Sequence, residues 1–238
     1  DDEFRALFEV GAHARACRIA GVLGMEHISD DGRLIAAFVF DADGVLLGEF
    51  SEERRNFVPI QQIPKVMQDA VLAAEDAKFY KHSGVNYVSV IRAGLANFGE
   101  ARSAQGASTI TMQVARNFYL STEKTFTRKI YEMLLSLKIE SLLSKEQILE
   151  VYMNHIALGQ RAYGFASASE IYFGKPLKDI TVAEAAMLAG LPKAPSAFNP
   201  ISNPKRAKTR QLYVLRRMHD LKYITDEEFR DAQNEPLN

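Results

Sequence analysis

The hydrophobic positions change their spacing once along the chain, from short runs near the amino end to a helical pattern. Two apolar runs, Ile35–Phe40 and Val45–Phe50, flank Asp43-Gly44, a pair that tolerates positive φ angles. These runs predict a β-hairpin. The thirty residues before them have weak periodicity and predict no element. We therefore expect a short amino-terminal β-hairpin followed by a mainly α fold.

Beyond Pro64, apolar residues recur at three- and four-residue spacing, which predicts amphipathic helices. The first predicted helix carries Glu75 and Asp76 at its end. Later helix starts, marked by polar caps, capping boxes or a proline, are predicted at Ser108, Thr122 or Thr125, Ser144, Thr181, Asn203 and Thr225. The third helix is predicted to bury an apolar face made of Phe126, Ile130, Met133, Leu134 and Leu137. Because no βαβ alternation occurs, Rossmann and P-loop folds have no support.

Composition is that of an ordinary globular chain, but the charge is unevenly distributed. The 238 residues have a net charge of −1, with 47% hydrophobic and 25% charged residues. Residues 1–76 have a net charge of −8 and residues 77–238 a net charge of +7, which favours an anionic partner for the longer part. The single Cys17 excludes an intrachain disulfide. No apolar run approaches the ~20 residues of a membrane helix, and the acidic opening Asp1-Asp2-Glu3 is not the pattern of a signal peptide.

The first candidate motif places Glu75 and Asp76 before an aromatic residue and His82. Adjacent carboxylates at a helix end point in different directions, so that one can face a cleft while the other pairs within the fold. A carboxylate sheltered by apolar neighbours has a raised pKa, which suits a general base near neutral pH. The structural alternative is that both acids pair with nearby lysines or arginines.

The second motif runs from Gly106 to Asn117 and includes Ser108 and Thr109 at a helix start. Free backbone amides and hydroxyls at the positive end of a helix bind phosphate oxygens, and Gln113 and Arg116 extend that polar face. Ordinary capping by Ser108 or Thr109 is the structural alternative. Periodicity does not separate the two.

The third motif crowds Arg128, Lys129 and Glu132 onto one helix face. If exposed, it is a weak solvated ion pair; if it lines a cleft, its two cations would hold a pyrophosphate. Ser121-Thr-Glu-Lys124 fits a penicillin-reactive S-x-x-K pattern, but no partner motif follows and a helix start is the better interpretation. The histidines have no metal-ligand spacing, so a structural metal is not expected.

Together these motifs resemble the peptidoglycan glycosyltransferases, glycosyltransferase family 51, of which one branch is the catalytic domain of class A penicillin-binding proteins. Five ordered blocks over roughly residues 43–235 carry the resemblance, with Met112 and Ser136 as mild departures and residues 1–33 unmatched. The matching residues are Glu75, Asp76, Phe79, His82 and Gly84; Gly106, Ser108, Thr109, Ile110, Thr111, Gln113, Arg116 and Asn117; Arg128, Lys129 and Glu132; 148–154, Gly159, Tyr163, Gly164 and 172–175; and 184–192, Pro195, Asn199 and Pro200.

The resemblance implies polymerisation of lipid II into β-1,4-linked glycan strands, with inversion at the donor sugar. It implies that Glu75 is the general base. It also implies that Glu132 is a second essential carboxylate, which orients Lys129, assists departure of the leaving group or helps to bind a divalent cation. It implies that the pyrophosphate is bound by Ser108, Thr109, Gln113, Arg116, Arg128 and Lys129. The residues that it implies hold the site in shape are Asp76, Phe79, His82 and Asn154. A divalent cation, Mg²⁺ or Mn²⁺, near Glu132 stays open, and no cofactor is required.

The implied fold is a lysozyme-like helical lobe with a smaller membrane-proximal jaw, as residues 51–238 after an amino-terminal segment, 1–50. We expect a catalytic domain on the periplasmic face of the cytoplasmic membrane, cut from an anchored parent that also carries a transpeptidase domain. Its partners would be lipid II, the growing glycan strand, the membrane surface and a cell-wall synthesis complex, with no nucleic acid. The alternatives are a lysozyme-like hydrolase or lytic transglycosylase, and a helical module that only docks on the membrane or a cell-wall complex.

Overall fold

The structure is a computed structural model that describes residues 12–19, 22–29, 34–40, 46–51, 54–87, 108–119 and 126–236. Side chains are described within 56–87, 108–117 and 127–236. The chain divides into two compact units, residues 1–54 and 55–238. The sequence predictions that lie outside the described residues are the loop beyond residue 87, Gly106, the motif Ser121–Lys124, a helix start at Thr122 or Thr125, and the side chain of Phe126.

The first unit contains a four-stranded antiparallel sheet, twice the size of the predicted hairpin. The hairpin itself is confirmed as β3 (Leu34–Phe40) and β4 (Leu46–Ser51). Before it come β1 (Ala12–Ile19) and β2 (Val22–Ser29), in the order β1-β2-β3-β4. The prediction missed β1 and β2; in β1, for example, the sequence alternates alanines with residues of mixed character, which is a weak hydrophobic signal.

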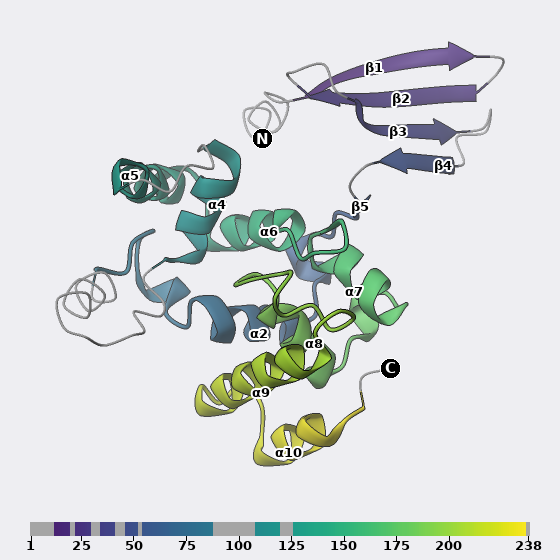
Figure 1. The fold of residues 1–238 in the computed structure, drawn as a ribbon. Coiled ribbons are helices and arrows are strands. Elements are labelled where there is room, and N and C mark those ends of the chain that lie inside the picture. Colours follow the sequence, from purple (N-terminus) through teal and green to yellow (C-terminus); the bar gives the residue numbers. More distant parts are fainter. Residues whose placement is uncertain are drawn as a thin grey trace. The chain divides into compact units, whose positions relative to one another are not determined.

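The second unit is mostly helical, as predicted, and Figure 1 shows its helices in sequence colours. A short strand at the unit boundary, β5 (Arg54–Arg55), pairs with β6 (Ala162–Tyr163). Three short 3-10 helices are η1 (Ile60–Gln62), η2 (Phe79–Lys81) and η3 (Leu177–Asp179). The α-helices described are α2 (Lys65–Glu75), α4 (Ile110–Tyr119), α5 (Phe126–Leu142), α6 (Lys145–His155), α7 (Phe165–Phe173), α8 (Val182–Gly190), α9 (Pro204–Asp220) and α10 (Asp226–Asn234).

Local capping signals predict several helix ends correctly. Ser144, Thr181 and Thr225 each form a capping box, in which the hydroxyl accepts from the third helical amide and the third side chain accepts from the cap amide. Gly174 ends α7 in the left-handed conformation, with φ of 65°. Pro204 occupies the first turn of α9. These ends are set by residues within one turn, so a sequence pattern is enough to find them.

The core of the second unit forms where α2, α8 and α9 pack against one another. Helix α8 is built largely from buried alanines, and small side chains let its neighbours approach closely. Met67 and Val71 of α2 and Val214 of α9 fill the space around it, all fully buried. Helix α6 packs against α4, and α4 against α5. This packing brings the end of α2 beside α4 and α9, where the predicted site residues lie.

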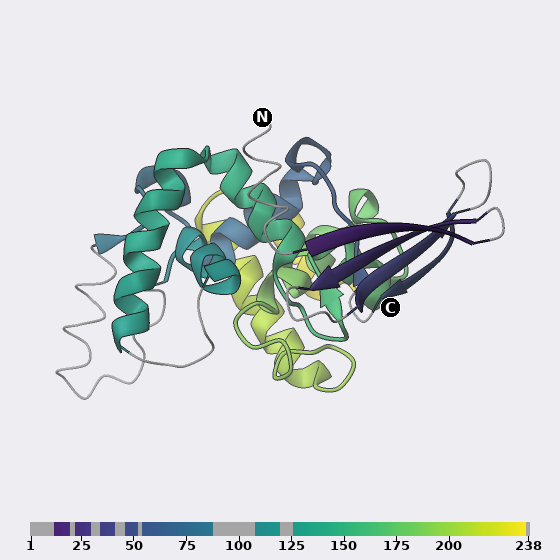
Figure 2. The same ribbon diagram turned by 90° about the horizontal axis from the view of Figure 1, so that it is seen from above.

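Helix α5 contradicts the predicted burial. Ile130, Leu134 and Leu137 were expected in the core, but their exposed fractions are 44%, 58% and 38%. The buried side of α5 instead carries Glu132, Ser136 and Ile139. The prediction was wrong because an apolar stripe identifies the hydrophobic face of a helix but does not show that this face packs against the rest of the protein. Both views place α5 at an edge of the second unit (Figure 1 and Figure 2).

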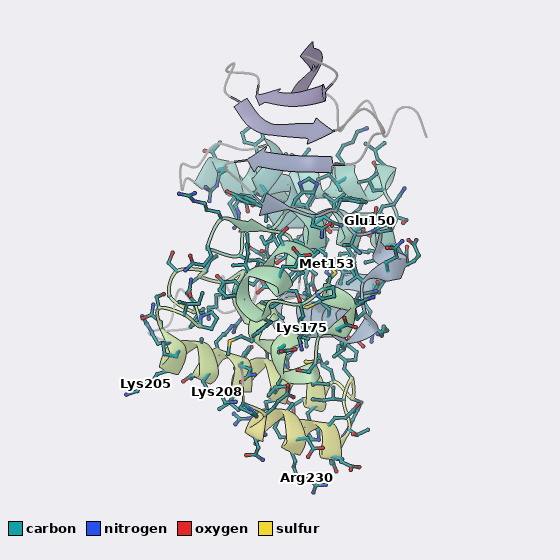
Figure 3. All side chains as sticks on the ribbon, turned by 90° about the vertical axis from the view of Figure 1, so that its right-hand side faces the viewer. Glu150, Met153, Lys175, Lys205, Lys208 and Arg230 are labelled. Carbon is teal, nitrogen blue, oxygen red and sulfur yellow. The ribbon has the colours of Figure 1, made fainter. Side chains whose placement is uncertain are left out.

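The outer faces of α9 and α10 are polar. Figure 3 shows Lys205 and Lys208 on α9 and Arg230 on α10 near the outside of the helical unit. Within the described residues, no helix combines the length and the apolar character that crossing a membrane requires.

Candidate active site

The end of helix α2 separates the two adjacent carboxylates. Glu75 is the last residue of α2, and Asp76 leaves the helix with φ of −155° and ψ of 77°. Glu75 Oε2 accepts a hydrogen bond from Gln113 Nε2 at 2.9 Å, and Glu75 Oε1 lies 3.8 Å from Arg210 Nη2. Asp76 Oδ2 accepts instead from the backbone amide of Ile110 at 3.2 Å. The two acids therefore have different partners, as the motif predicts.

Glu75 is a carboxylate held in a largely dry environment. Its side chain is only 12% exposed, and burial raises the pKa of Glu75 above its ordinary value. The hydrogen bond from Gln113 and the charges of Arg210, Lys193 and Arg116 each lower that pKa, but burial is the largest effect. A carboxyl with a raised pKa takes up a proton more readily than a surface carboxyl, which is the property of a general base.

Gln113 joins Glu75 to a buried tyrosine. The Tyr152 hydroxyl lies 3.4 Å from Gln113 Oε1 and donates to it, so the Gln113 amide nitrogen faces Glu75. Burial raises the pKa of Tyr152 well above its ordinary value, and the charge of Glu75 raises it further, so the hydroxyl keeps its proton. Gln113 therefore links the carboxylate of Glu75 to the hydroxyl of Tyr152.

Asp76 orients the start of α4. Besides Ile110, it contacts His82, whose Nε2 lies 2.9 Å from Asp76 Oδ2. Thr109 caps the same helix, since its hydroxyl accepts from the Met112 amide at 3.1 Å and donates to the Gly84 carbonyl. Thr109 therefore caps α4.

The cationic motif on α5 meets the start of α4. Lys129 Nζ donates to Ser108 Oγ and to Glu132 Oε2, both at 2.7 Å. Arg128 Nε lies 3.3 Å from Glu132 Oε1. Since the Glu132 side chain is only 1% exposed, the solvated ion pair considered from the sequence does not describe it.

The side chains around Glu132 do not suit a divalent cation held by the protein. Mg²⁺ and Mn²⁺ prefer several oxygen ligands, whereas Glu132 already faces two cations. Within the described residues, no group of three or more His, Cys, Asp or Glu side chains is arranged to hold a metal ion. We therefore derive no step through a metal.

Phe79 and Asn154 act on the fold around the site. Phe79 is 1% exposed, packs edge-on against His82 and lies under Lys145 Nζ, 4.3 Å from the ring centroid. Asn154 Oδ1 accepts from the Val58 amide at 2.8 Å, and Asn154 Nδ2 donates to the Val58 carbonyl at 2.9 Å. Asn154 therefore fastens the first segment of the second unit onto α6.

Sequence reasoning missed three residues near Glu75: Tyr152 as the partner of Gln113, and Arg210 and Lys193 as neighbouring cations. Tyr152 lay within a matched block without an assigned role. Arg210 belongs to a helix with many basic residues, so its position there carried no signal of its own. Only the packing of α9 against α2 identifies it.

A buried carboxylate with a raised pKa, next to a helix start that is hydrogen-bonded to a lysine, is the arrangement of an acid–base enzyme site. The chain belongs to the transglycosylase family, whose model matches residues 43–219.

Individual relatives agree with this membership. The chain is 57% identical over 200 residues to penicillin-binding protein 1A of Neisseria gonorrhoeae, covering 84% of this chain and 25% of that one. It is 59% identical over 182 residues to a putative transglycosylase of Cupriavidus necator, covering 76% and 78%. A crystal structure of penicillin-binding protein 1A from Haemophilus influenzae matches 84% of this chain and 20% of that one, at 33% identity and a TM-score of 0.49. The chain thus spans about a quarter of the length of the penicillin-binding proteins.

Proposed function

We propose that this chain is a peptidoglycan glycosyltransferase that polymerises lipid II into β-1,4-linked glycan strands. The observation that carries the proposal is the hydrogen-bonded position of buried Glu75 beside helix α4, whose start binds Lys129 through Ser108. Ser108 lies just before α4 and Gln113 in its first turn, so the residue that binds Lys129 and the residue that binds Glu75 lie about one helical turn apart along α4. That spacing suits a base and a phosphate-binding group acting at opposite sides of one sugar.

The reaction would run in one displacement. Glu75 accepts the proton of the acceptor sugar 4-hydroxyl as its oxygen attacks the anomeric carbon of the donor. The bond from that carbon to the pyrophosphate oxygen breaks, and the electron pair leaves with the pyrophosphate. Lys129, Arg128 and Arg116 stabilise the charge that develops there. Attack opposite the leaving group inverts an α-linked donor into a β linkage.

Glu132 fits a supporting role in this scheme. It is buried and lies within reach of both Arg128 and Lys129, so it fixes the two cations on one side of α5. Without it, two adjacent cations would repel each other and turn towards solvent. We assign to it the orientation of Lys129 rather than a proton transfer.

The apolar face of α5 supports a membrane partner. Tyr131 and Leu134 are each 58% exposed, and Leu142 is 59% exposed, on the helix whose opposite face holds Lys129. We propose that this face lies on the membrane surface, because a lipid-linked substrate presents its pyrophosphate there. Leu134→Gln should reduce sedimentation with phosphatidylcholine vesicles, whereas Lys205→Gln, at an exposed position on α9, should leave sedimentation unchanged.

The wider setting is inferred from the relatives. We propose that residues 51–238 form the catalytic domain, and that the parent chain is membrane-anchored, carries a transpeptidase domain and acts on the periplasmic face. A cell-wall synthesis complex is a further proposed partner.

The decisive experiment is a glycan polymerisation assay with lipid II, comparing wild type with Glu75→Gln. We expect strands of β-1,4-linked sugars from wild type and a loss of roughly a hundredfold or more in the variant. Equal synthesis by both would overturn the base assignment. Cleavage of preformed glycan without synthesis would indicate a lytic enzyme, and no synthesis by folded, lipid-supplied wild type would indicate a docking module.

A further inference from the structure

Arg210 is a buried arginine that the proposed mechanism does not use. It lies on α9 and is 7% exposed. Its Cγ would lie 2.8 Å from a β-carbon on Gly190, so the arginine stem passes over the glycine at the end of α8. The guanidinium carbon lies 4.7 Å from the Tyr213 ring centroid and 5.8 Å from that of Phe198. A bare α-carbon and two aromatic faces thus enclose this side chain along its length.

Burying a guanidinium is unfavourable unless a nearby anion offsets the loss of water. For Arg210 that anion is Glu75, 3.8 Å from Nη2 to Oε1. Arg210 also reaches the Gly190 carbonyl, which accepts from Nε at 3.5 Å. The packing of α8, α9 and the 191–203 loop therefore directs one positive charge at the carboxylate that ends α2.

The two oxygens of Glu75 have different surroundings. Oε2 accepts a hydrogen bond of 2.9 Å from Gln113, whereas Oε1 faces Arg210 at a distance too long for a charge-assisted hydrogen bond, which is typically about 2.8 Å. Arg210 therefore attracts Oε1 without occupying its lone pairs. A direct bidentate pair would bind the carboxylate more firmly but would compete with a substrate hydroxyl for it.

Other charged or titratable groups also face Glu75. Arg116 lies on α4, Lys193 on the loop after α8, and the hydroxyl of Tyr152 approaches from α6. Lys193 is exposed, so solvent and salt screen its effect. Partial loss of solvent around its amine, followed by the charge of Arg210, lowers the pKa of Lys193. Among the described cations that act on Glu75, Arg210 is the most completely buried.

We propose that Arg210 is the positioning residue of the catalytic base: it holds Oε1 of Glu75 towards α9, keeps the carboxylate ionised, and leaves that oxygen available to the acceptor hydroxyl. This inference rests on the proposed role of Glu75. Arg210 itself touches neither sugar nor phosphate in this scheme. Its removal should therefore change when the base is ionised more than how tightly lipid II binds.

The test compares Arg210→Met with Arg210→Lys and with Arg216→Met, an exposed control on the same helix. For each folded variant, kcat and KM for lipid II are measured across pH. In Arg210→Met the acid limb of the kcat profile should move to higher pH, because loss of the cation raises the pKa of Glu75. On that limb kcat should fall roughly tenfold for each pH unit by which it moves. KM should change much less, Arg210→Lys should recover part of the loss, and Arg216→Met should match wild type.

A second variant covers the case in which Arg210→Met does not fold. Gly190→Ala keeps the charge but pushes the Arg210 stem, and it should move the acid limb in the same direction. An unmoved acid limb in both folded variants overturns the proposal. A raised KM with an unmoved limb would show that Arg210 binds substrate instead. Glu75→Gln, assayed in parallel, separates the role of Glu75 from that of Arg210. Wild-type activity in Glu75→Gln would refute Glu75 as the base. An inactive Glu75→Gln together with an unmoved acid limb in Arg210→Met would refute only the positioning role of Arg210.

Discussion

The contacts of Asn154 predict a large loss of stability when its side chain is removed. Asn154 makes three hydrogen bonds to backbone groups: from the Val58 amide at 2.8 Å, to the Val58 carbonyl at 2.9 Å, and to the Glu150 carbonyl at 2.9 Å. Each is worth about 1 kcal/mol net, and a buried group left without a partner costs at least as much. Asn154→Ala should therefore lower the free energy of unfolding by about 3 kcal/mol.

The assay is urea denaturation followed by far-ultraviolet circular dichroism, whose helical signal reports mainly on the second unit. The control is Asn56→Ala, which removes one exposed side-chain bond of 3.3 Å to Glu170 and should cost less than about 0.5 kcal/mol. The comparison is valid if both variants unfold in a single transition with the wild-type slope. A loss below about 1 kcal/mol in Asn154→Ala would refute the reasoning, since its three bonds would then carry no net stability.

A companion variant tests the polarity of the same contact. Asn154→Asp keeps the acceptor for Val58 but places a second oxygen against the Val58 and Glu150 carbonyls. Ionisation in that position is unfavourable, so the folded-state pKa of the new carboxyl should rise. Its stability deficit should then be small at low pH, where the carboxyl retains a donor proton, and grow as pH rises through that pKa. A deficit independent of pH would contradict this account.

Three further predictions concern the site. Because burial raises the pKa of Glu75, ionising this carboxyl makes the folded protein less stable as pH rises through the folded-state pKa. The free energy of unfolding of Glu75→Gln, measured by urea titration, should therefore rise relative to that of wild type between acid and neutral pH. The expected gain is about 1.4 kcal/mol for each pH unit that separates the folded-state pKa from the unfolded one. Gly164 has φ of 79° and its β-carbon would lie 2.5 Å from the Asn154 carbonyl oxygen, so Gly164→Ala should lower the thermal midpoint, with a loss of about 2 kcal/mol or more. Lys129→Met should reduce kcat/KM for lipid II polymerisation roughly a hundredfold in a kinetic assay, while Lys138→Met should not.

Helix positions could be predicted because their signals are local. The capping boxes of Ser144, Thr181 and Thr225 act within one turn, and all three are present. Strand β1 was missed for the opposite reason, since its pairing with β2 adds hydrogen bonds that leave no mark on the sequence pattern. Local chemistry specifies element ends, whereas strand pairing depends on a partner.

The candidate site was predicted in part. Glu75, Gln113, Lys129 and Glu132 were named as one functional set, but their mutual contacts were not foreseeable from spacing. Gln113 was predicted to bind the phosphates, and the structure shows that it also bonds Glu75, a contact that the sequence did not indicate. The direct bond between Lys129 and Ser108 was likewise not indicated by the sequence, because it joins two different segments of the chain.

Helix α4 explains why the two adjacent acids occur together. The Ile110 backbone amide binds Asp76 and the Gln113 side-chain amide binds Glu75, so residues three apart on one helix face hold residues adjacent on another chain segment. Any rotation of α4 that weakened the first contact would also move Gln113 away from the base. Asp76 therefore fixes the helix that in turn orients Glu75, and loss of either carboxylate should affect the same reaction through different steps. Exchanging Glu75 and Asp76 would place the shorter aspartate side chain opposite Gln113 and the longer glutamate side chain opposite the Ile110 amide, which should abolish both contacts.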